Sequence, residues 1–219
     1  MMAFFKAAIF DLDGTLIDSM GIWETIDYIF LNRRDINVPD GYVEIVKTMS
    51  FEKAAFYTVE RFGLPDSKEE VIQEWLKLAL AEYSSNIELK PGVRSYLRLL
   101  SQQGVKMGVA TTNQACLFEP VLHNNGVYNL FSAFTTLDEV EFDKSCPDIY
   151  LLAADKLKVK ARECVVFEDT LMGVTGAKRA KMKVVGVFDR YSIGDQAAII
   201  AKADKYIYDF HEMMDSSGF

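Results

Sequence analysis

Two aspartates, Asp11 and Asp13, stand one residue apart, directly after the apolar run AAIF and before a Gly-Thr pair. Carboxylates this close repel each other and resist ionising together unless a cation or a reacting group lies between them. A solvated turn after a strand would also account for the pair. An EF-hand calcium loop would not, because its sixth and twelfth positions need glycine and glutamate, and this chain has Leu16 and Ile22 there.

Further polar groups follow other apolar runs of the chain. They are Thr111, Thr112 and Asn113 after VKMGVA, Lys144 in the loop after SAFTT, and Glu168 and Asp169 after CVVF. Each has a plainer explanation when taken alone, such as a surface lysine, or a helix N-cap with an acidic first turn. What matters is whether the fold brings them together.

The apolar runs alternate with helical patterns, which predicts a parallel sheet buried on both faces. The expected strands are AAIF, VKMGVA, SAFTT, CVVF, KVVGVF and a weaker KYIY, and the expected helices span 92–103, 115–125, 147–156, 171–181 and 193–201. Gly173, Ala177 and Ala180 would give the fourth helix a small face for packing on the sheet. Because ligands bind beyond the carboxyl ends of parallel strands, we expect the polar groups to meet at one edge.

Acids and phosphate-type donors would converge at that edge. Carboxylate oxygens are hard ligands of the kind Mg²⁺ takes. The expected magnesium ligands are Asp11, Asp13, Glu168 and Asp169. Thr111 and Asn113 add neutral donors near a helix start, and Lys144 adds a point charge, so the edge could hold a phosphate dianion beside the cation.

Residues 19–88 break the strand–helix rhythm and show apolar residues at helical spacing in IWETIDYIFL, FEKAAFYTVERF and KEEVIQEWLKLALAEY. We therefore expect an α/β core from 1–18 and 89–219 and a helical cap from 19–88. The expected hinges are IDSMG at entry and IELKPG at exit, where Pro-Gly restarts the α/β pattern.

The composition excludes several classes of protein. The 219 residues include 32 Asp and Glu but only 24 Lys and Arg, which gives a net charge of -8. This negative charge disfavours binding to nucleic acid or to an acidic membrane. Three scattered cysteines suggest reduced thiols, and no apolar stretch is long enough for a membrane helix. His123 and His211 have no partner pattern, which disfavours a Ser-His-Asp hydrolase. We expect a cytoplasmic monomer acting on a small molecule.

In this order, Asp-x-Asp-Gly-Thr, Thr, Lys and Glu-Asp resemble the motifs of the haloacid dehalogenase superfamily of phosphotransferases. The resemblance covers essentially the whole chain, and the insertion is similar to the cap of the β-phosphoglucomutase-like and phosphoglycolate-phosphatase-like branch. It implies a doubly wound, Rossmann-like α/β core with an all-helical cap. It also implies a Mg²⁺-dependent phosphatase of a small phosphorylated metabolite, such as a sugar phosphate-like monoester.

The resemblance also implies residue roles. Asp11 would attack phosphorus to form an aspartyl-phosphate, and Asp13 would protonate the leaving alcohol and then activate water. Thr111 would bind the phosphoryl group, and Lys144 would steady Asp11. Substrate phosphate would also meet Gly14, Thr112, Asn113 and the cap residue Lys47, while Asp11, Asp169 and the Asp13 carbonyl would hold Mg²⁺, with Glu168 close or acting through water.

Three activities of the family remain to be weighed. Dehalogenases and phosphonatases of this superfamily lack the second aspartate, so Asp13 argues against both. Phosphomutases keep it, but the β-phosphoglucomutase pattern has a histidine where this chain has Trp23, and a cap arginine where it has Phe51. Arg33 or Arg34 could replace that arginine. We expect a phosphatase, with a mutase as the alternative and a non-catalytic phosphate-binding regulator after that.

Overall fold

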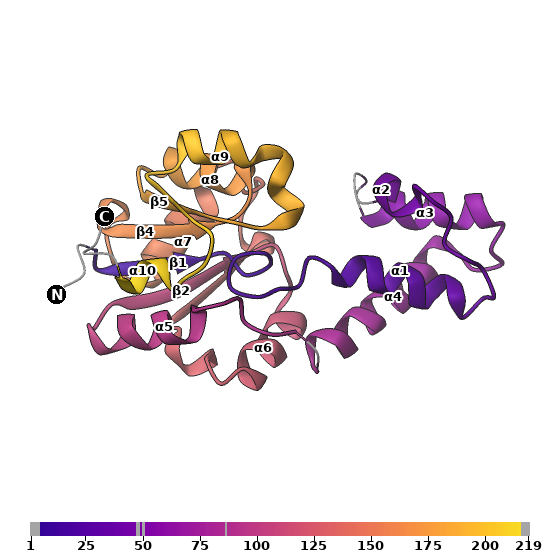
Figure 1. Cartoon of the computed structure of the whole chain (residues 1–219), viewed down its shortest axis with the longest axis horizontal. Coiled ribbons are helices and arrows are strands. Elements are labelled where there is room, and N and C mark those ends of the chain that lie inside the picture. Colours follow the sequence, from indigo (N-terminus) through magenta and orange to yellow (C-terminus); the bar gives the residue numbers. More distant parts are fainter. Residues whose placement is uncertain (1–4, 47–48, 50, 86, 216–219) are drawn as a thin grey trace. The chain divides into compact units, whose positions relative to one another are not determined.

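The computed structural model describes residues 5–46, 49, 51–85 and 87–215. The chain forms two compact units, one from Met1–Met20 and Ile87–Phe219 and the other from Gly21–Asn86. We call them the core unit and the cap unit and describe each by itself (Figure 1). That the core unit is catalytic and the helical unit is its cap stays a prediction.

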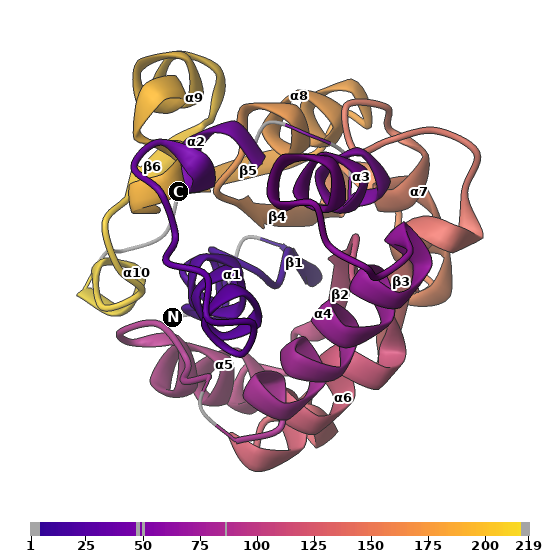
Figure 2. The ribbon, with the colours of Figure 1, turned by 90° about the vertical axis from the view of Figure 1, so that its right-hand side faces the viewer.

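The core unit is built on a six-stranded sheet in the order β3-β2-β1-β4-β5-β6, and every neighbouring pair is parallel. The strands are β1 (Ala7–Phe10), β2 (Lys106–Thr111), β3 (Ala133–Thr136), β4 (Cys164–Glu168), β5 (Lys183–Val187) and β6 (Lys205–Ile207). Figure 2 shows them side by side in this order. Strand β1 is central and wholly buried, as its uninterrupted apolar run predicts.

Helices cover both faces of this sheet. They are α5 (Val93–Gln102), α6 (Ala115–Asn124), α7 (Asp148–Lys156), α8 (Leu171–Arg179), α9 (Gln196–Lys202) and α10 (Glu212–Asp215). Figures 1 and 2 place α8 and α9 on one face and α5 and α6 on the other. On the first face, Ile9 and Val166 pack with Ala177 of α8. On the second, Phe10 stacks on Phe167 at 4.7 Å between ring centroids.

The cap unit is helical, with α1 (Ile22–Asn32), α2 (Tyr42–Val46), α3 (Phe51–Phe62) and α4 (Lys68–Tyr83). Ser67 and Glu70 form a capping box that starts α4. The core of this unit is aromatic, because Trp75 contacts Phe30 and Phe51 with ring centroids 5.7 and 5.5 Å away. Among the described residues, none of the helices combines the length and apolarity needed to cross a bilayer.

The expected fold class, an α/β parallel sheet with an inserted helical cap, is confirmed. Two short helices, α2 and α10, carry no periodic signal long enough to predict them. The helix expected at 193–201 starts only at Gln196. Its first residues instead form a 3-10 turn, Arg190–Asp195, because the Asp189 carboxylate accepts a hydrogen bond from the backbone of Tyr191.

The segment by which the chain leaves the core unit pairs with the segment by which it returns. Ile17 and Leu89 form an antiparallel bridge, and the amide of Lys90 donates to the carbonyl of Leu16 at 2.9 Å. Gly92 has a φ of +80° and packs so closely that a Cβ there would lie 2.5 Å from the backbone nitrogen of His211. Much of the segment expected to be the exit hinge is therefore fixed to the core.

Candidate active site

The carboxyl ends of two neighbouring strands bring three acids together. Asp11 follows β1 and Glu168 ends β4, and the pairing of Phe10 with Phe167 sets these two residues side by side. With Asp169 they form a group whose ligand oxygens all lie within 4.8 Å of one another. All three are buried, with Glu168 fully inaccessible. Buried carboxylates so close need positive charge or protons between them.

Lys144 supplies part of that positive charge. Its ammonium forms an ion pair with Asp11 and donates to Oε1 of Glu168 at 2.7 Å. Burial opposes the charge, but Asp11 and Glu168 outweigh it and raise the pKa of Lys144 above its ordinary value. The loop that carries the lysine sits against α8 at Gly176, where a Cβ would lie only 2.0 Å from the Lys144 carbonyl oxygen. Only glycine allows this approach.

Glu168 is held by donors from three directions. Besides Lys144, the Tyr150 hydroxyl donates to Oε1 at 2.7 Å and the Thr170 hydroxyl donates to Oε2 at 3.1 Å. At Gly173, a Cβ would fall 2.1 Å from the Glu168 carboxyl carbon. The small face expected on this helix therefore makes room for a carboxylate as well as for the sheet. Glu168 is fixed in orientation before any ligand arrives.

Asp169 is contacted from two loops. The hydroxyl of Thr15 donates to its Oδ1 at 3.0 Å, and that of Ser192 donates to Oδ2 at 3.4 Å. Gly14 has a φ of +80° and packs on the same carboxylate, since a Cβ there would lie 2.4 Å from Oδ2. The glycine of the Asp-x-Asp-Gly-Thr run is thus required both by its backbone angle and by the space that Asp169 occupies.

Asp13 lies at the same edge and is half-buried. Its carboxylate accepts hydrogen bonds from the Ser19 hydroxyl at 2.6 Å and from the Asn113 side-chain amide at 2.7 Å. The backbone N–H of Asn113 donates to the Thr111 hydroxyl at 3.0 Å, so the loop after β2 is connected to the loop after β1. Two neutral donors hold the second aspartate, while a cation holds the first.

Burial controls the protonation of the acids. It raises the pKa of Asp11 to about 7, a rise that Lys144 opposes and Glu168 and Asp13 increase. Burial, together with Asp11 and Glu168, also raises the pKa of Asp169 well above its usual range. A divalent cation among these oxygens would replace the protons and favour the ionised forms, because metal ligands must be deprotonated. The donor set, hard and oxygen-rich, fits such a cation.

The structure brings most of the expected residues to one edge of the sheet. Those that contact one another, directly or through one neighbour, are Asp11, Asp13, Gly14, Thr111, Asn113, Lys144, Glu168 and Asp169. Thr112 is exposed beside Thr111. Lys47 lies outside the described residues. The sequence reasoning missed Tyr150 and Ser192, because the first sits in an apolar helix pattern and the second in a short turn.

The arginines expected as possible cap cations are engaged within the cap unit. Arg34 donates to Asp66 at 2.8 Å and to Glu74 at 2.7 Å, and its guanidinium lies 3.8 Å from the centre of the Phe30 ring. Arg33 forms a longer ion pair with Glu74, at 3.5 Å.

A parallel sheet with acids, a lysine and hydroxyl donors at its carboxyl edge, and a helical insert after its first strand, defines a class of hydrolase. The chain belongs to the haloacid dehalogenase-like hydrolase family, whose profile matches residues 8–187. Its relatives place it among the phosphatases of that family.

The similarity extends over most of the chain. It is 32% identical to YhcW of Bacillus subtilis over 82% of both chains. It is 29% identical to hexitol phosphatase B of Escherichia coli over 83% of this chain and 82% of that one. It is 28% identical to the phosphorylated carbohydrates phosphatase of Thermotoga maritima, covering 89% and 90% of the two. The β-phosphoglucomutase structure from Clostridium difficile shares the fold, with a TM-score of 0.71, 21% identity and coverage of 95% and 93%.

Proposed function

We propose that this chain is a Mg²⁺-dependent phosphatase that hydrolyses small phosphate monoesters of the sugar-phosphate kind through an aspartyl-phosphate. The observation that carries the proposal is the ion pair between Lys144 and Asp11 inside the buried acidic group. An aspartate held by a lysine and poised beside other acids is suited to attack a phosphate dianion, because a cation and the ammonium together offset the charge.

The residues divide between holding the cation and transferring the group. Asp11, Asp169 and the backbone carbonyl of Asp13 would hold Mg²⁺, with Glu168 close to it or bound through water. The ion would neutralise charge on the phosphoryl oxygens. Thr111, Asn113 and backbone amides near them would bind the same oxygens, with Gly14 and Thr112 beside them, and Lys47 of the cap would contribute if it reaches the substrate.

The reaction would run in two steps. In the first, an Asp11 carboxylate oxygen bonds to phosphorus while the bond to the leaving oxygen breaks, and Asp13 gives that oxygen its proton. In the second, a water attacks the aspartyl-phosphate, Asp13 takes a proton from the water, and phosphate leaves with Asp11 regenerated. The hydrogen bonds that Asp13 accepts from Ser19 and Asn113 support this assignment, because they hold its carboxyl group in one orientation.

Two observations favour a phosphatase over the mutase alternative. A mutase must bind a second, non-reacting phosphate, and Arg34 is occupied by Asp66 and Glu74. Trp23 and Phe51, which take the places of a histidine and an arginine, contact each other edge to face with centroids 5.4 Å apart. Neither side chain can neutralise a phosphate. The relatives named as phosphatases of hexitols and of phosphorylated carbohydrates support a sugar-phosphate substrate, and we propose that the protein acts on it as a monomer.

A panel of phosphorylated metabolites with Mg²⁺ tests the proposal. β-Glucose 1-phosphate with a trace of the 1,6-bisphosphate separates the two alternatives, read out for free phosphate and for glucose 6-phosphate. Release of phosphate from this or another small monoester supports the phosphatase. Isomerisation much faster than phosphate release would replace it by the mutase, and no turnover of any phosphate ester would favour a non-catalytic phosphate-binding protein.

A further inference from the structure

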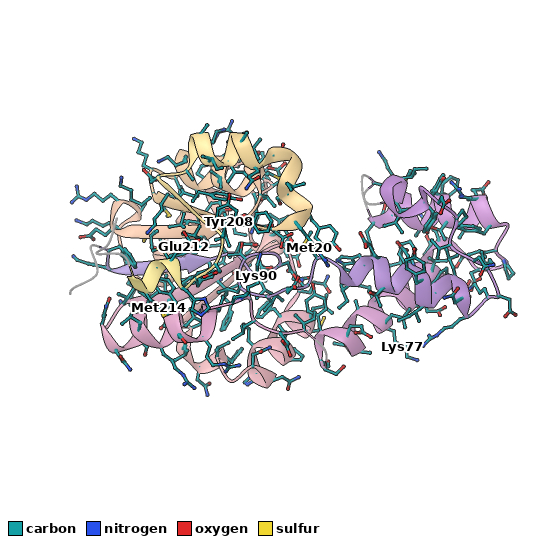
Figure 3. All side chains as sticks on the ribbon, viewed as in Figure 1. Met20, Lys77, Lys90, Tyr208, Glu212 and Met214 are labelled. Atoms are coloured by element: carbon teal, nitrogen blue, oxygen red, sulfur yellow. The ribbon has the colours of Figure 1, made fainter. Side chains whose placement is uncertain are left out.

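Lys90 is a partly buried lysine that lies outside the acidic group. It stands just before Pro91, where the chain re-enters the core unit, and its side chain is 11% exposed (labelled in Figure 3). Its ammonium donates to the carbonyl oxygens of Gly14 and Phe188, each at 2.6 Å, and to Oδ2 of Asp189 at 3.0 Å. An ammonium has three N–H donors, so each of them has an acceptor here.

The three acceptors lie in two loops that carry the site, one at Gly14 and the other at Phe188 and Asp189. Gly14 directly follows Asp13 and packs on the carboxylate of Asp169. Asp189 begins the turn after β5, where it caps the backbone of Tyr191 at 2.9 Å. The residue after Tyr191 in that turn, Ser192, donates to Asp169. Lys90 therefore joins the two turns that contact Asp169.

The charge of Lys90 also matches its surroundings. Asp189 is 4% exposed and adds another carboxylate close enough to act electrostatically on Asp169. A buried carboxylate is costly unless it is paired and hydrogen-bonded. Lys90 forms an ion pair with Asp189 and so compensates its charge. The carboxylates of Asp11 and Asp169 are then available to the cation, with no uncompensated acid beside them.

We propose that Lys90 is a positioning residue for the phosphatase reaction, a role that rests on the function proposed above. Its ammonium holds the Asp13–Gly14 turn and the turn from Phe188 to Ser192 in one arrangement. Asp13 then meets the leaving oxygen while Asp169 meets the cation. Lys90 touches neither the substrate nor the cation and acts through these turns.

A purely structural ion pair is the competing explanation, and a double substitution separates the two. Lys90→Met removes all three donors at nearly the same volume and leaves Asp189 buried and unpaired. Lys90→Met with Asp189→Asn removes that charge as well, while the introduced amide can still accept a hydrogen bond from the Tyr191 backbone. Lys178→Met is the matched control, because Lys178 pairs with Asp204 at 2.8 Å near the start of β5, at the opposite edge of the sheet.

The readouts are Tm, kcat and KM with p-nitrophenyl phosphate, and the Mg²⁺ concentration that gives half of the Mg²⁺-induced rise in Tm. We expect Lys90→Met to lower Tm and to lower kcat about 100-fold with little change in KM, since small displacements of reacting groups have effects of this size. The Mg²⁺ midpoint should rise. In the double variant Tm should recover, while kcat and the Mg²⁺ midpoint stay as in Lys90→Met. Lys178→Met should leave kcat and the midpoint unchanged.

Two outcomes would overturn the proposal. One is recovery of kcat together with Tm in the double variant, which would make the pair structural only. The other is a Lys90→Met enzyme with wild-type kcat and Mg²⁺ midpoint. If the wild-type protein itself hydrolyses no phosphate ester, the proposed function fails, but the Mg²⁺ midpoint still tests whether Lys90 positions Asp169.

Discussion

The hydroxyl of Tyr150 donates a 2.7 Å hydrogen bond to Oε1 of Glu168, joining the buried side of α7 to the end of β4. Tyr150 is fully buried, and burial with the nearby Glu168 raises the pKa of its phenol well above the ordinary value. The phenol therefore stays protonated and always donates. Since Lys144 donates to the same oxygen, the position of the lysine depends on a tyrosine that faces away from solvent.

Tyr150→Phe should accordingly lower activity but not abolish it. The change removes one donor to a buried carboxylate, and loss of a hydrogen bond that orients a metal ligand typically costs 10- to 100-fold. We expect kcat to fall about tenfold and Tm to fall modestly. Tyr128→Phe is the control, because its hydroxyl contacts Glu119 only at 3.5 Å. Equal effects of the two substitutions on kcat would contradict the assignment.

Asp11→Asn should abolish turnover while the fold persists. An amide cannot form the acyl phosphate, and loss of a residue that acts as part of a catalytic unit lowers kcat by about 10⁴ or more. The introduced amide can still accept a hydrogen bond from Lys144, and one repelling charge is gone from the acidic group, so Tm without metal should not fall. Hydrolysis near the wild-type rate would refute Asp11 as the nucleophile, and circular dichroism checks the fold.

Removal of Mg²⁺ should stop the reaction reversibly. EDTA should abolish turnover and excess Mg²⁺ should restore it, while Ca²⁺ should support it poorly because its larger shell changes the geometry. Asp169→Ala should raise the Mg²⁺ requirement more than Glu168→Gln, because three protein donors already hold Glu168. Full activity in chelator, or the reverse ranking of the two variants, would contradict the metal assignment.

The position of most of these residues could be predicted from the sequence, because they directly follow a recognisable strand. Asp11 follows β1 and Glu168 ends β4, and the parallel register of these strands places the two residues side by side. Lys144 was harder, since it lies in a loop eight residues beyond β3, and only its order among the motifs identified it. Tyr150 and Lys90 had no such marker. Their roles depend on which groups α7 and the segment before α5 contact in the folded chain.

The helices α3 and α4 matched their sequence patterns to the residue, since Ser67 and Glu70 mark the start of α4 and apolar residues recur at helical spacing. The small face predicted on α8 packs on the sheet, with Ala177 and Ala180 in the same cluster as Ile9 and Val166 and with Gly173 against Glu168 at the end of β4. Gly176, which was not predicted, makes room for the Lys144 loop. A one-dimensional pattern shows that a face is small but not which group fills the space.

Asp27 should make the cap unit sensitive to pH. This aspartate of α1 is 7% exposed, and burial, with a contribution from Glu24, raises its pKa to about 7 from 3.8. The folded form therefore binds the proton more tightly than the unfolded chain does. Its stabilising effect is complete below pH 3.8 and is lost as pH rises through about 7. Asp27→Asn should thus raise the free energy of unfolding at pH 8 more than at pH 5, by at most about 3 kcal/mol. Denaturant unfolding at the two pH values measures this gap. Exposed Asp40→Asn is the control, and a gap that does not grow with pH would contradict the prediction.

Arg34→Met should weaken the cap unit without affecting the binding of phosphate. The guanidinium bonds Asp66, Glu74 and the Phe30 carbonyl, all within the cap, and covers the Phe30 ring. Breaking this network should lower the free energy of unfolding by about 1 to 3 kcal/mol and should lower Tm. KM for a phosphate monoester should stay within about twofold of wild type, because the guanidinium is already paired with the carboxylates of Asp66 and Glu74. Arg61→Met, which removes an exposed arginine from α3, controls for loss of a charge. A large rise in KM for Arg34→Met at unchanged kcat would mean that this arginine leaves its partners to bind substrate, and that would reopen the mutase alternative.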